Sequence, residues 1–198
     1  MDIAIMGSSG GAGKDTVANL IRSVSKRNFE IMSLGDPIHN TADELLGRKA
    51  ERKYLQEYGE AVRRIFGQDV WMKYLDRKTK EHSDKYGIII PDIRKLIEFS
   101  HYCVEGNFKA IYVYNDAETA RKRLTQRDGG YDEKSMQQGI ETQLQFIEEM
   151  IKAESVINDR RYIDEIEVGG VTVSVIDNSH QLSDTREQVE RWWENFGE

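Results

Sequence analysis

The chain has 198 residues, of which 38% are hydrophobic and 32% are charged. A chain of this size and composition is expected to fold as one α/β domain with at most a small inserted subdomain, and it is too apolar to be disordered throughout. The net charge is −7, and basic residues are scattered among acidic ones. Because proteins that bind duplexes usually present a basic face, we expect no nucleic acid partner.

No apolar run approaches the length of about 18 residues that a membrane span needs, so no membrane partner is expected. The first residues lack the basic segment and long apolar stretch of a secretory signal. The single cysteine, Cys103, cannot form an intrachain disulfide, which agrees with a reducing compartment. We therefore expect a cytoplasmic protein (in the host cytoplasm, if a phage encodes it).

The N-terminal part begins with a short apolar run, residues 2–6, which is closed by glycines and predicts a buried parallel strand. From residue 14 to about 27, apolar side chains recur three, four and seven positions along from Val17, which predicts one buried face of a helix. Residues 29–34 predict a second strand. Asp36, which is followed by a proline, is then the candidate N-cap of the next helix.

The rest of the chain continues to alternate between strand and helix patterns. The predicted elements are helices at 50–66 and 69–85, a strand at 87–92, a helix at 94–104, a strand at 110–114, a helix at 117–127, a long helical pattern from 136 to 151, a hairpin about Gly169 and Gly170, a strand at 171–176, and a helix at 184–196 capped by Ser183. This alternation predicts an α/β fold with a mainly parallel sheet of five strands and helices on both faces.

A glycine-rich loop, residues 7–16, joins the first strand to the first helix and reads Gly-Ser-Ser-Gly-Gly-Ala-Gly-Lys-Asp-Thr. Its small residues allow backbone N–H groups to surround phosphate oxygens, and the helix N-terminus adds partial positive charge. Lys14 is placed to reach the terminal phosphates. Thr16 is placed to support an inner phosphate or the metal ion, directly or through water. The sequence therefore predicts a phosphate loop.

The phosphate loop departs from the strict Walker A spacing. Ser8 stands where a glycine is expected, Asp15 stands where Ser or Thr is expected, and Thr16 comes one residue late. A glycine-rich turn that only caps a helix is the alternative. The order of apolar strand, glycine loop, Gly-Lys pair and amphipathic helix favours the phosphate site, because this is the structural context that the motif requires.

The Gly-Lys-Asp-Thr variant of the loop resembles that of phage-type deoxynucleoside monophosphate kinases, within the wider group of P-loop nucleoside monophosphate kinases. Further segments resemble the same family in the same order. They are residues 35–38 (Gly-Asp-Pro-Ile), 55–63 (Leu-Gln-Glu-Tyr-Gly-Glu-Ala-Val-Arg), 67–71 (Gly-Gln-Asp-Val-Trp), 91–94 (Pro-Asp-Ile-Arg) with Glu98, and 175–178 (Val-Ile-Asp-Asn). The resemblance covers residues 1–127, fades between 128 and 170, and returns at 175–178.

The resemblance implies a P-loop kinase fold in one domain, residues 1–198, with a helical acceptor-binding region at 36–86 and a helical lid inserted at about 128–165. It implies an enzyme that uses ATP and Mg²⁺ to convert a (deoxy)nucleoside 5′-monophosphate to the diphosphate. The partner would be this small-molecule nucleotide, and the protein would be a monomer or a homodimer.

The donor site is expected to combine the phosphate loop with later segments. Arg123 and Arg127 resemble the Arg-x-x-x-Arg pair that nucleoside monophosphate kinases carry at the lid hinge, although an exposed, salt-bridged helix face is the alternative. Lys14 and Arg127 are the expected catalytic residues, because phosphoryl transfer depends on charge stabilisation. The expected ATP-binding residues are Ser9, Gly10, Gly11, Ala12, Gly13, Lys14, Asp15, Thr16, Arg123 and Asn178, and the residue expected at the metal is Thr16.

The acceptor site is expected beyond the carboxyl ends of the strands, where ligands bind in open α/β sheets. Asp36 and Asp92 follow two such strands, although each is also able to cap a helix. By the resemblance, Arg63 holds the acceptor phosphate, and a glycine one turn earlier would let the ligand approach. Arg94 would serve the same phosphate or pair with a carboxylate, and Trp71 would lie beside the acceptor or fill the core.

Other kinds of P-loop protein are alternatives to this reading. Dephospho-coenzyme A kinase and the animal-type phosphomevalonate kinase, which also has a Gly-Lys-Asp loop, are the nearest enzymes. A nucleotide-binding protein without catalysis is an alternative of another class. Consumption of ATP that depends on an acceptor would distinguish a kinase from such a protein.

Overall fold

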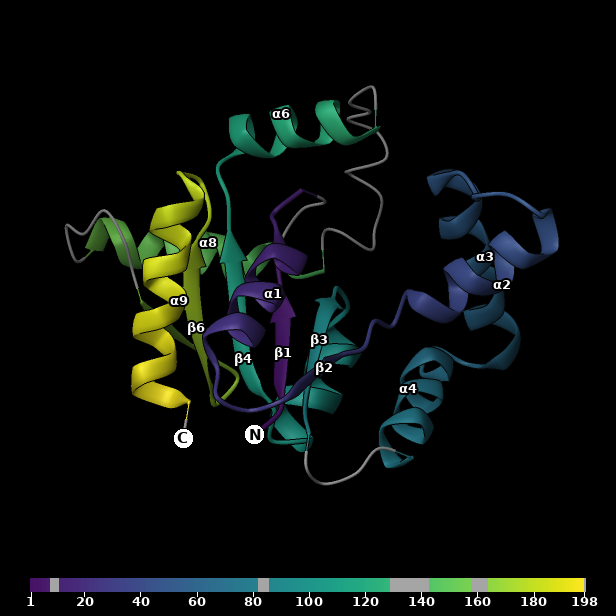
Figure 1. The fold of residues 1–198 in the computed structure, drawn as a ribbon, viewed down its shortest axis with the longest axis horizontal. Coiled ribbons are helices and arrows are strands. Elements are labelled where there is room, and N and C mark those ends of the chain that lie inside the picture. Colours follow the sequence, from purple (N-terminus) through teal and green to yellow (C-terminus); the bar gives the residue numbers. More distant parts are fainter. Residues whose placement is uncertain (8–10, 82–85, 129–142, 158–163, 198) are drawn as a thin grey trace.

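The computed structural model describes residues 1–7, 11–81, 86–128, 143–157 and 164–197. Its strands are β1 (Ile3–Met6), β2 (Phe29–Ile31), β3 (Gly87–Ile93), β4 (Lys109–Tyr114), β5 (Glu165–Val168) and β6 (Val171–Asp177). Within these residues they form one sheet of six strands in the order β2-β3-β1-β4-β6-β5 (Figure 1). Every neighbouring pair is parallel except β5 with β6. The predicted α/β class with a mainly parallel sheet is confirmed.

The helices are α1 (Lys14–Val24), α2 (Asp36–Leu46), α3 (Arg52–Phe66), α4 (Val70–Lys80), α5 (Leu96–Phe99), the π-helix η1 (Ser100–Glu105), α6 (Ala117–Asp128), α8 (Gln145–Ile157) and α9 (Leu182–Phe196). Helices cover both faces of the sheet, while α2 and α3 lie to one side of it and α6 lies above its upper edge (Figure 1). The helix predicted at 94–104 is thus divided between α5 and η1. In the part of the chain described here, no helix is both long enough and apolar enough to cross a membrane.

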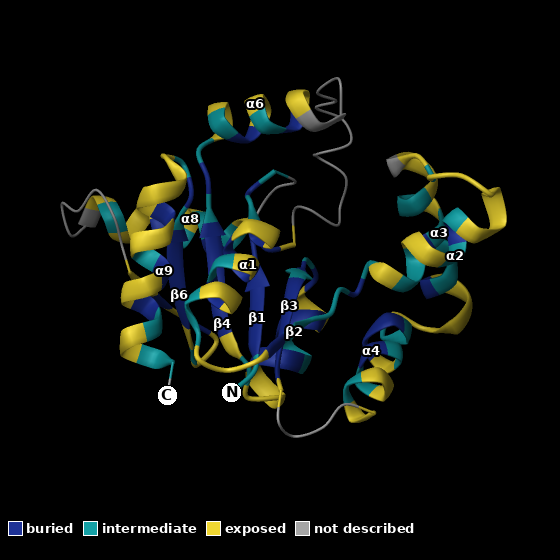
Figure 2. Ribbon diagram, in the orientation of Figure 1, coloured by how far each residue is buried: buried dark blue, intermediate teal, exposed yellow. Residues whose placement is uncertain are grey.

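The two faces of the sheet carry separate hydrophobic cores, because successive side chains of a strand point to opposite faces. Ile3 and Ile5 of β1 lie in the core beneath α1 and α9, whereas Ala4 and Met6 lie in the core on the other face. Side chains of α4, α5, η1 and α8 complete that second core. Figure 2 shows the strands as the buried centre of the molecule. Each buried Ile or Met side chain contributes about 1.5–3 kcal/mol, so the sheet is a stable base for the loops at its ends.

Three loops leave the sheet at the same edge, above the carboxyl ends of β1, β3 and β4. Met6, the last residue of β1, is in register with Ile93 of β3 and with Tyr112 of β4. From β1 the chain crosses to β2 on one side of the sheet, and from β4 it continues to β6 on the other side. Open α/β sheets bind ligands at such a switch point, so this edge is where a site is expected.

The sheet has six strands where five were expected, because both arms of the predicted hairpin belong to it. Ile166 of β5 pairs with Val173 of β6 in an antiparallel ladder. The turn between the arms consists of Gly169 and Gly170, whose φ angles are +59° and +81°. A two-residue hairpin turn of type I′ needs positive φ at both positions, which glycine adopts without strain.

Two predicted helix caps lie slightly too late in the sequence. Helix α2 already includes Asp36, and its N-cap is Gly35. Helix α9 begins at Leu182, and its N-cap is Gln181 instead of Ser183. The backbone N–H of Gln181 donates to the Asp184 carboxylate at 3.3 Å, so an acidic residue inside the first turn, and not the serine, completes the start of this helix.

Part of the predicted lid region belongs to the core. Leu144, Ile147 and Ile151 lie within residues 128–165, and all three are buried in the core that also contains α4 and η1. Helix α8 therefore packs as part of the core of the sheet. The first half of the helical pattern predicted at 136–151 lies outside the described residues.

Candidate active site

The phosphate loop between β1 and α1 is shaped by glycines in a conformation that other residues rarely adopt. Gly11 and Gly13 have φ angles of +86° and +90°. A Cβ added to Gly13 would lie 2.0 Å from Nδ2 of Asn178, so a larger residue does not fit there. Of the residues expected to bind ATP, Ser9 and Gly10 lie outside the described residues.

The residues after the glycines form the start of α1. Lys14 opens the helix and is buried, with 9% of its surface exposed. Asp15 and Thr16 follow in the first turn, and both are exposed. The helix N-terminus adds its partial positive charge at this point. Lys14 and Thr16 therefore lie at the position where the phosphates of a nucleotide and its metal ion would be bound.

Two asparagines from neighbouring strands hold the phosphate loop in place. Nδ2 of Asn178, which follows β6, donates to the carbonyl oxygen of Ala12 at 2.8 Å. Nδ2 of Asn115, which follows β4, donates to the carbonyl oxygen of Gly11 at 3.2 Å. Because N–H and C=O of a trans peptide point in opposite directions, anchoring these carbonyls to the strands turns the N–H groups that follow toward the opposite side. This is the arrangement that surrounds a phosphate with N–H donors.

Asn178 is thus committed to the backbone of the loop. It is 3% exposed, and its Oδ1 accepts a hydrogen bond from Oγ1 of Thr185 at 2.8 Å. Its amide therefore fixes the loop, and the prediction that it contacts ATP stays a prediction. Asn115 and Thr185 were not among the predicted site residues. Asn115 was detectable as a polar residue directly after a strand at the switch point, but no local pattern indicates Thr185.

Helix α6 packs on the outside of the phosphate loop. A Cβ on Gly11 would lie 3.0 Å from Cγ of Leu124, so the helix and the loop are in close contact. Arg123 lies on the same helix, with Nη1 3.7 Å from the ideal Cβ position of Gly13. Arg127 is in the last turn of α6, and its side chain is not described.

Nη1 of Arg123 is inaccessible to solvent and, among the described residues, has no hydrogen-bond partner. A buried donor without an acceptor costs about 1–3 kcal/mol, and more when the group is charged. A phosphate oxygen on the loop would remove this cost. The environment of Arg123 therefore fits an anionic ligand better than an exposed, salt-bridged helix face.

Near the end of β3, Asp92 organises the loop that leads into α2. Its carboxylate accepts hydrogen bonds from Oγ of Ser33 at 2.6 Å, from the N–H of Leu34 at 2.9 Å and from the N–H of Gly35 at 2.8 Å. Asp36 follows this loop and is exposed, and it accepts one longer hydrogen bond of 3.3 Å from the N–H of Ser33. Asp92 therefore positions the loop before α2, while Asp36 is exposed at its end.

Arg63 is buried in a group of four charged side chains, which we call the charge cluster. Its members are Glu60 and Arg63 of α3, and Lys95 and Glu98 after β3. Arg63 contacts Oε1 of Glu60 at 2.6 Å and Oε1 of Glu98 at 3.3 Å. Lys95, which the sequence analysis did not identify, contacts Oε1 of Glu60 at 2.9 Å. Two buried cations therefore lie together beyond the end of β3.

The pKa values of the two carboxyl groups in the charge cluster are shifted in opposite directions. Burial raises the pKa of Glu98, although hydrogen bonds from the N–H groups of Arg94 and Lys95 favour its ionised form. Burial also acts to raise the pKa of Glu60, but the hydrogen bond from Lys95 and the charge of Arg63 hold that pKa below its ordinary value. Arg94 contributes its backbone N–H here, and the residue is half-buried.

Trp71 and Gly59 lie at the contacts of α3 with α4 and with α2. Nε1 of Trp71, which is buried, donates to the carbonyl oxygen of Gly59 at 3.3 Å, and its ring lies 6.5 Å from that of Tyr58. A Cβ on Gly59 would lie 3.0 Å from Cδ1 of Ile38. The glycine therefore makes room for the close approach of α2.

The donor groups of the site suit a nucleotide that arrives with its own metal ion. Among the residues that the structure describes, no group of three His, Cys, Asp or Glu side chains is arranged to hold a metal. Mg²⁺ usually binds through phosphates and water with few protein ligands, so Thr16 and the phosphates would be enough.

Comparisons with known proteins identify the fold. No protein-family model and no curated protein matches the chain. A sugar kinase from Janibacter matches with a TM-score of 0.51 and 16% identity, over 98% of this chain and 94% of its own. A protein from Thermus thermophilus matches with a TM-score of 0.53 and 18% identity, over 99% of this chain and 97% of its own. A gluconokinase from Sinorhizobium meliloti has a TM-score of 0.48 at 15% identity, over 99% and 95% of the two chains. The chain therefore shares the α/β fold of these structures, and identities this low show nothing beyond the fold.

Proposed function

We propose that the protein is an ATP- and Mg²⁺-dependent kinase that phosphorylates a (deoxy)nucleoside 5′-monophosphate. One observation carries the proposal. A phosphate loop anchored by Asn115 and Asn178 lies under an arginine, Arg123, whose buried Nη1 has no acceptor among the described residues. The same sheet edge also carries the buried cations Arg63 and Lys95. Two anion-binding positions at one edge suit transfer between two phosphates.

On the donor side, the N–H groups of the loop and the N-terminus of α1 would bind the ATP phosphates. Lys14 would hold the phosphoryl group that is transferred, and Thr16 would support the phosphates or the metal-bound water. Mg²⁺ would neutralise charge between the last two phosphates. Arg123 would neutralise charge over the loop, where its Nη1 already lies near Gly13.

On the acceptor side, Arg63 would fix the phosphate of the monophosphate, and Asp92 would keep the loop before α2 in the position that closes this side of the site. The reaction needs no general base, because a phosphomonoester is already anionic at pH 7. The role of the protein is then to place the two phosphates in line and to exclude water.

A panel of acceptors tests the proposal. Formation of ADP from ATP is measured with the four deoxynucleoside and four ribonucleoside monophosphates, each added alone. We expect ADP formation to rise strongly with at least one of them. An ATP turnover that no monophosphate increases would contradict the proposed function.

The likeness in fold to a sugar kinase favours one second candidate, a kinase that acts on a sugar hydroxyl. A hydroxyl acceptor needs a carboxylate that accepts its proton, and the exposed Asp36 is the group at this edge that would do so. Sugars and sugar acids belong in the same panel, together with dephospho-coenzyme A and phosphomevalonate. If only a sugar stimulated ADP formation, this candidate would replace the first.

A further inference from the structure

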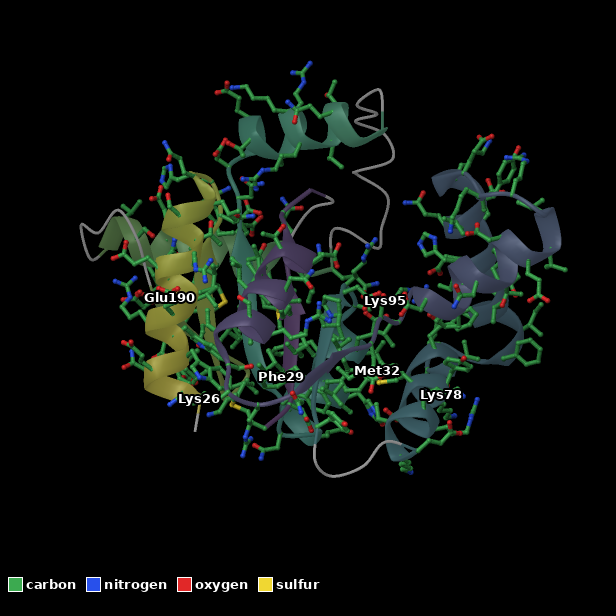
Figure 3. The ribbon with its side chains drawn as sticks, viewed as in Figure 1. Lys26, Phe29, Met32, Lys78, Lys95 and Glu190 are labelled. Carbon is green, nitrogen blue, oxygen red and sulfur yellow. The ribbon has the colours of Figure 1, made fainter. Side chains whose placement is uncertain are left out.

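The charge cluster has an unusual arrangement, in which one carboxylate oxygen bridges two buried cations. Oε1 of Glu60 lies 2.6 Å from Nη1 of Arg63 and 2.9 Å from Nζ of Lys95. Arg63 is 8% exposed and Lys95 is 5% exposed. Figure 3 shows Lys95 between the sheet and the helices of the acceptor region. An oxygen held by two buried cations is in the environment that proteins provide for a phosphate oxygen.

The two carboxylates of the charge cluster are not held equally. Oε2 of Glu98 accepts hydrogen bonds from the N–H groups of Arg94 and Lys95, so this side chain is fixed at the start of α5. The side chain of Glu60 is 34% exposed. The contacts described for its carboxylate are those with the two cations. Rotation about its side-chain bonds would carry the Glu60 carboxylate into solvent, whereas Glu98 cannot leave without uncapping the helix.

We propose that Glu60 occupies the position at which the acceptor's phosphate binds, between Arg63 and Lys95, and we call this position the seat. Lys95 is then a second acceptor-binding cation beside Arg63. The inference rests on the proposed function, because it assigns the phosphomonoester of that reaction to the seat. On binding, phosphate oxygens replace Oε1 of Glu60 on both cations, and the Glu60 carboxylate turns to solvent. Glu60 thereby competes with the acceptor until a group of higher charge displaces it.

The donors of the seat fit a phosphomonoester better than a carboxylate. With Glu60 displaced, Arg63 keeps its ion pair with Glu98, whereas Lys95 loses its ion pair with Glu60. Nε of Arg63 is also buried and, among the described residues, has no acceptor. A phosphate group offers three oxygens and up to two negative charges, so it can serve both cations and this third donor at once. A single carboxylate has fewer oxygens and carries the same charge as the Glu60 group that it would have to displace.

The seat lies on the correct edge of the sheet for transfer. Ile93 of β3 is in register with Met6 of β1. Lys95 follows Ile93 by two residues, and the phosphate loop begins directly after Met6. The segment that carries Lys95 and the phosphate loop therefore leave adjacent strands at the same level. An in-line reaction between two bound phosphates requires such proximity.

Binding measurements test the seat without relying on catalysis. The phosphate loop is first filled with Mg²⁺ and a non-hydrolysable ATP analogue, and inorganic phosphate or a nucleoside monophosphate is then titrated by calorimetry. We expect Lys95→Met to raise the Kd of both by about tenfold or more, since a charged hydrogen bond is lost. Lys73→Met is the matched control, because Lys73 pairs with Asp69 and its side chain is 65% exposed. It should leave the Kd unchanged.

Two further variants separate a direct contact from an indirect effect. Glu60→Gln removes the competing charge and should lower the Kd. The double variant Glu60→Gln with Lys95→Met has no unpaired Glu60 carboxylate, and it should still bind more weakly than Glu60→Gln alone. If the double variant bound as tightly as Glu60→Gln, Lys95 would have acted only by neutralising Glu60, and its assignment would be overturned. Weaker binding by Glu60→Gln would overturn the assignment of Glu60 as a competitor.

The outcomes for the seat and for the reaction are distinct. If Lys95→Met binds and phosphorylates a monophosphate as the wild type does, the seat is wrong and the proposed function stands. If the variants change the binding of inorganic phosphate as expected but no monophosphate is phosphorylated, the seat stands and the proposed function fails. If neither inorganic phosphate nor any monophosphate binds, the seat is wrong.

Discussion

The side-chain amide of Asn178 donates a hydrogen bond of 2.8 Å to the carbonyl oxygen of Ala12, although the two residues are 166 positions apart. The hydrogen bond ties the phosphate loop, near the start of the chain, to the end of β6. Asn178 is itself held by the hydroxyl of Thr185 in α9. The shape of the loop therefore depends on the C-terminal part of the chain, and not on its own glycines alone.

We predict that Asn178→Ala lowers both stability and ATP affinity. The substitution leaves the Ala12 carbonyl and the Thr185 hydroxyl without their partner, which costs about 1–3 kcal/mol for a buried polar group. The loop would also lose the anchor that orients its N–H donors. Urea unfolding and a titration with an ATP analogue measure the two effects. Asn19→Ala, an exposed asparagine of α1, is the control and should change neither. An unchanged ATP affinity in the folded Asn178→Ala protein would show that this anchor does not shape the site.

Asp92→Asn is predicted to impair use of the acceptor more than use of ATP. The amide group of an asparagine would present N–H groups to donors that now contact a carboxylate, among them Oγ of Ser33 and the N–H of Gly35. The loop before α2 would shift, and misplacement of the acceptor would raise its KM by about tenfold or more. Steady-state kinetics with each substrate varied in turn measures the effect. If KM for ATP rose as much as KM for the acceptor, Asp92 would belong to the donor side.

Much of the fold was predictable because it depends on local patterns. The apolar run before the phosphate loop and the Gly-Gly pair of the hairpin each predicted the element that the structure has there. The contacts of Asn115, Thr185 and Lys95 were not predictable in this way. Asn115 and Lys95 contact residues 104 and 35 positions away, and Thr185 contacts Asn178 across the turn into α9. No periodicity or spacing encodes these contacts. The close contact of Gly59 was not predictable either, because its neighbour Ile38 belongs to another helix, α2.

The start of α6 provides a pH-dependent contribution to stability. The Asp116 carboxylate accepts hydrogen bonds from the N–H of Thr119 at 2.9 Å and from its hydroxyl at 2.7 Å. These bonds lower its pKa below the ordinary value of 3.8. A carboxylate with a depressed pKa stabilises the folded state above its ordinary pKa, and this stabilisation is lost as the pH falls through the depressed value.

We therefore predict that Asp116→Asn is less stable than the wild type at pH 7, and that the difference shrinks below a pH of about 3.8. Asparagine is nearly isosteric, so the comparison isolates the charge. Urea unfolding across this range of pH measures the difference in the free energy of unfolding. A difference that stayed constant down to the lowest pH at which the protein is folded would show that the charge of Asp116 is not responsible.

Trp71 is predicted to report on the acceptor side. It is buried against α3 through its hydrogen bond to Gly59, so binding of a monophosphate near Arg63 should change its fluorescence. Trp192 lies in the core on the opposite face of the sheet, with Trp193 packed against that core, and both should be insensitive. Trp71→Phe keeps an aromatic ring in the core and should remove most of the change. A change that persisted in the folded Trp71→Phe protein would assign it to another tryptophan.

The most direct test of the account compares the wild type with Lys14→Met in one assay, the formation of ADP from ATP with and without a nucleoside monophosphate. Methionine keeps the apolar stem of the buried Lys14 and removes its charge, so the protein should stay folded. Loss of one charge-stabilising group costs about 2.7–4 kcal/mol of barrier, so turnover that depends on the acceptor should fall by about 100-fold or more. Turnover close to that of the wild type in a folded Lys14→Met protein would contradict the claim that phosphoryl transfer takes place on this loop.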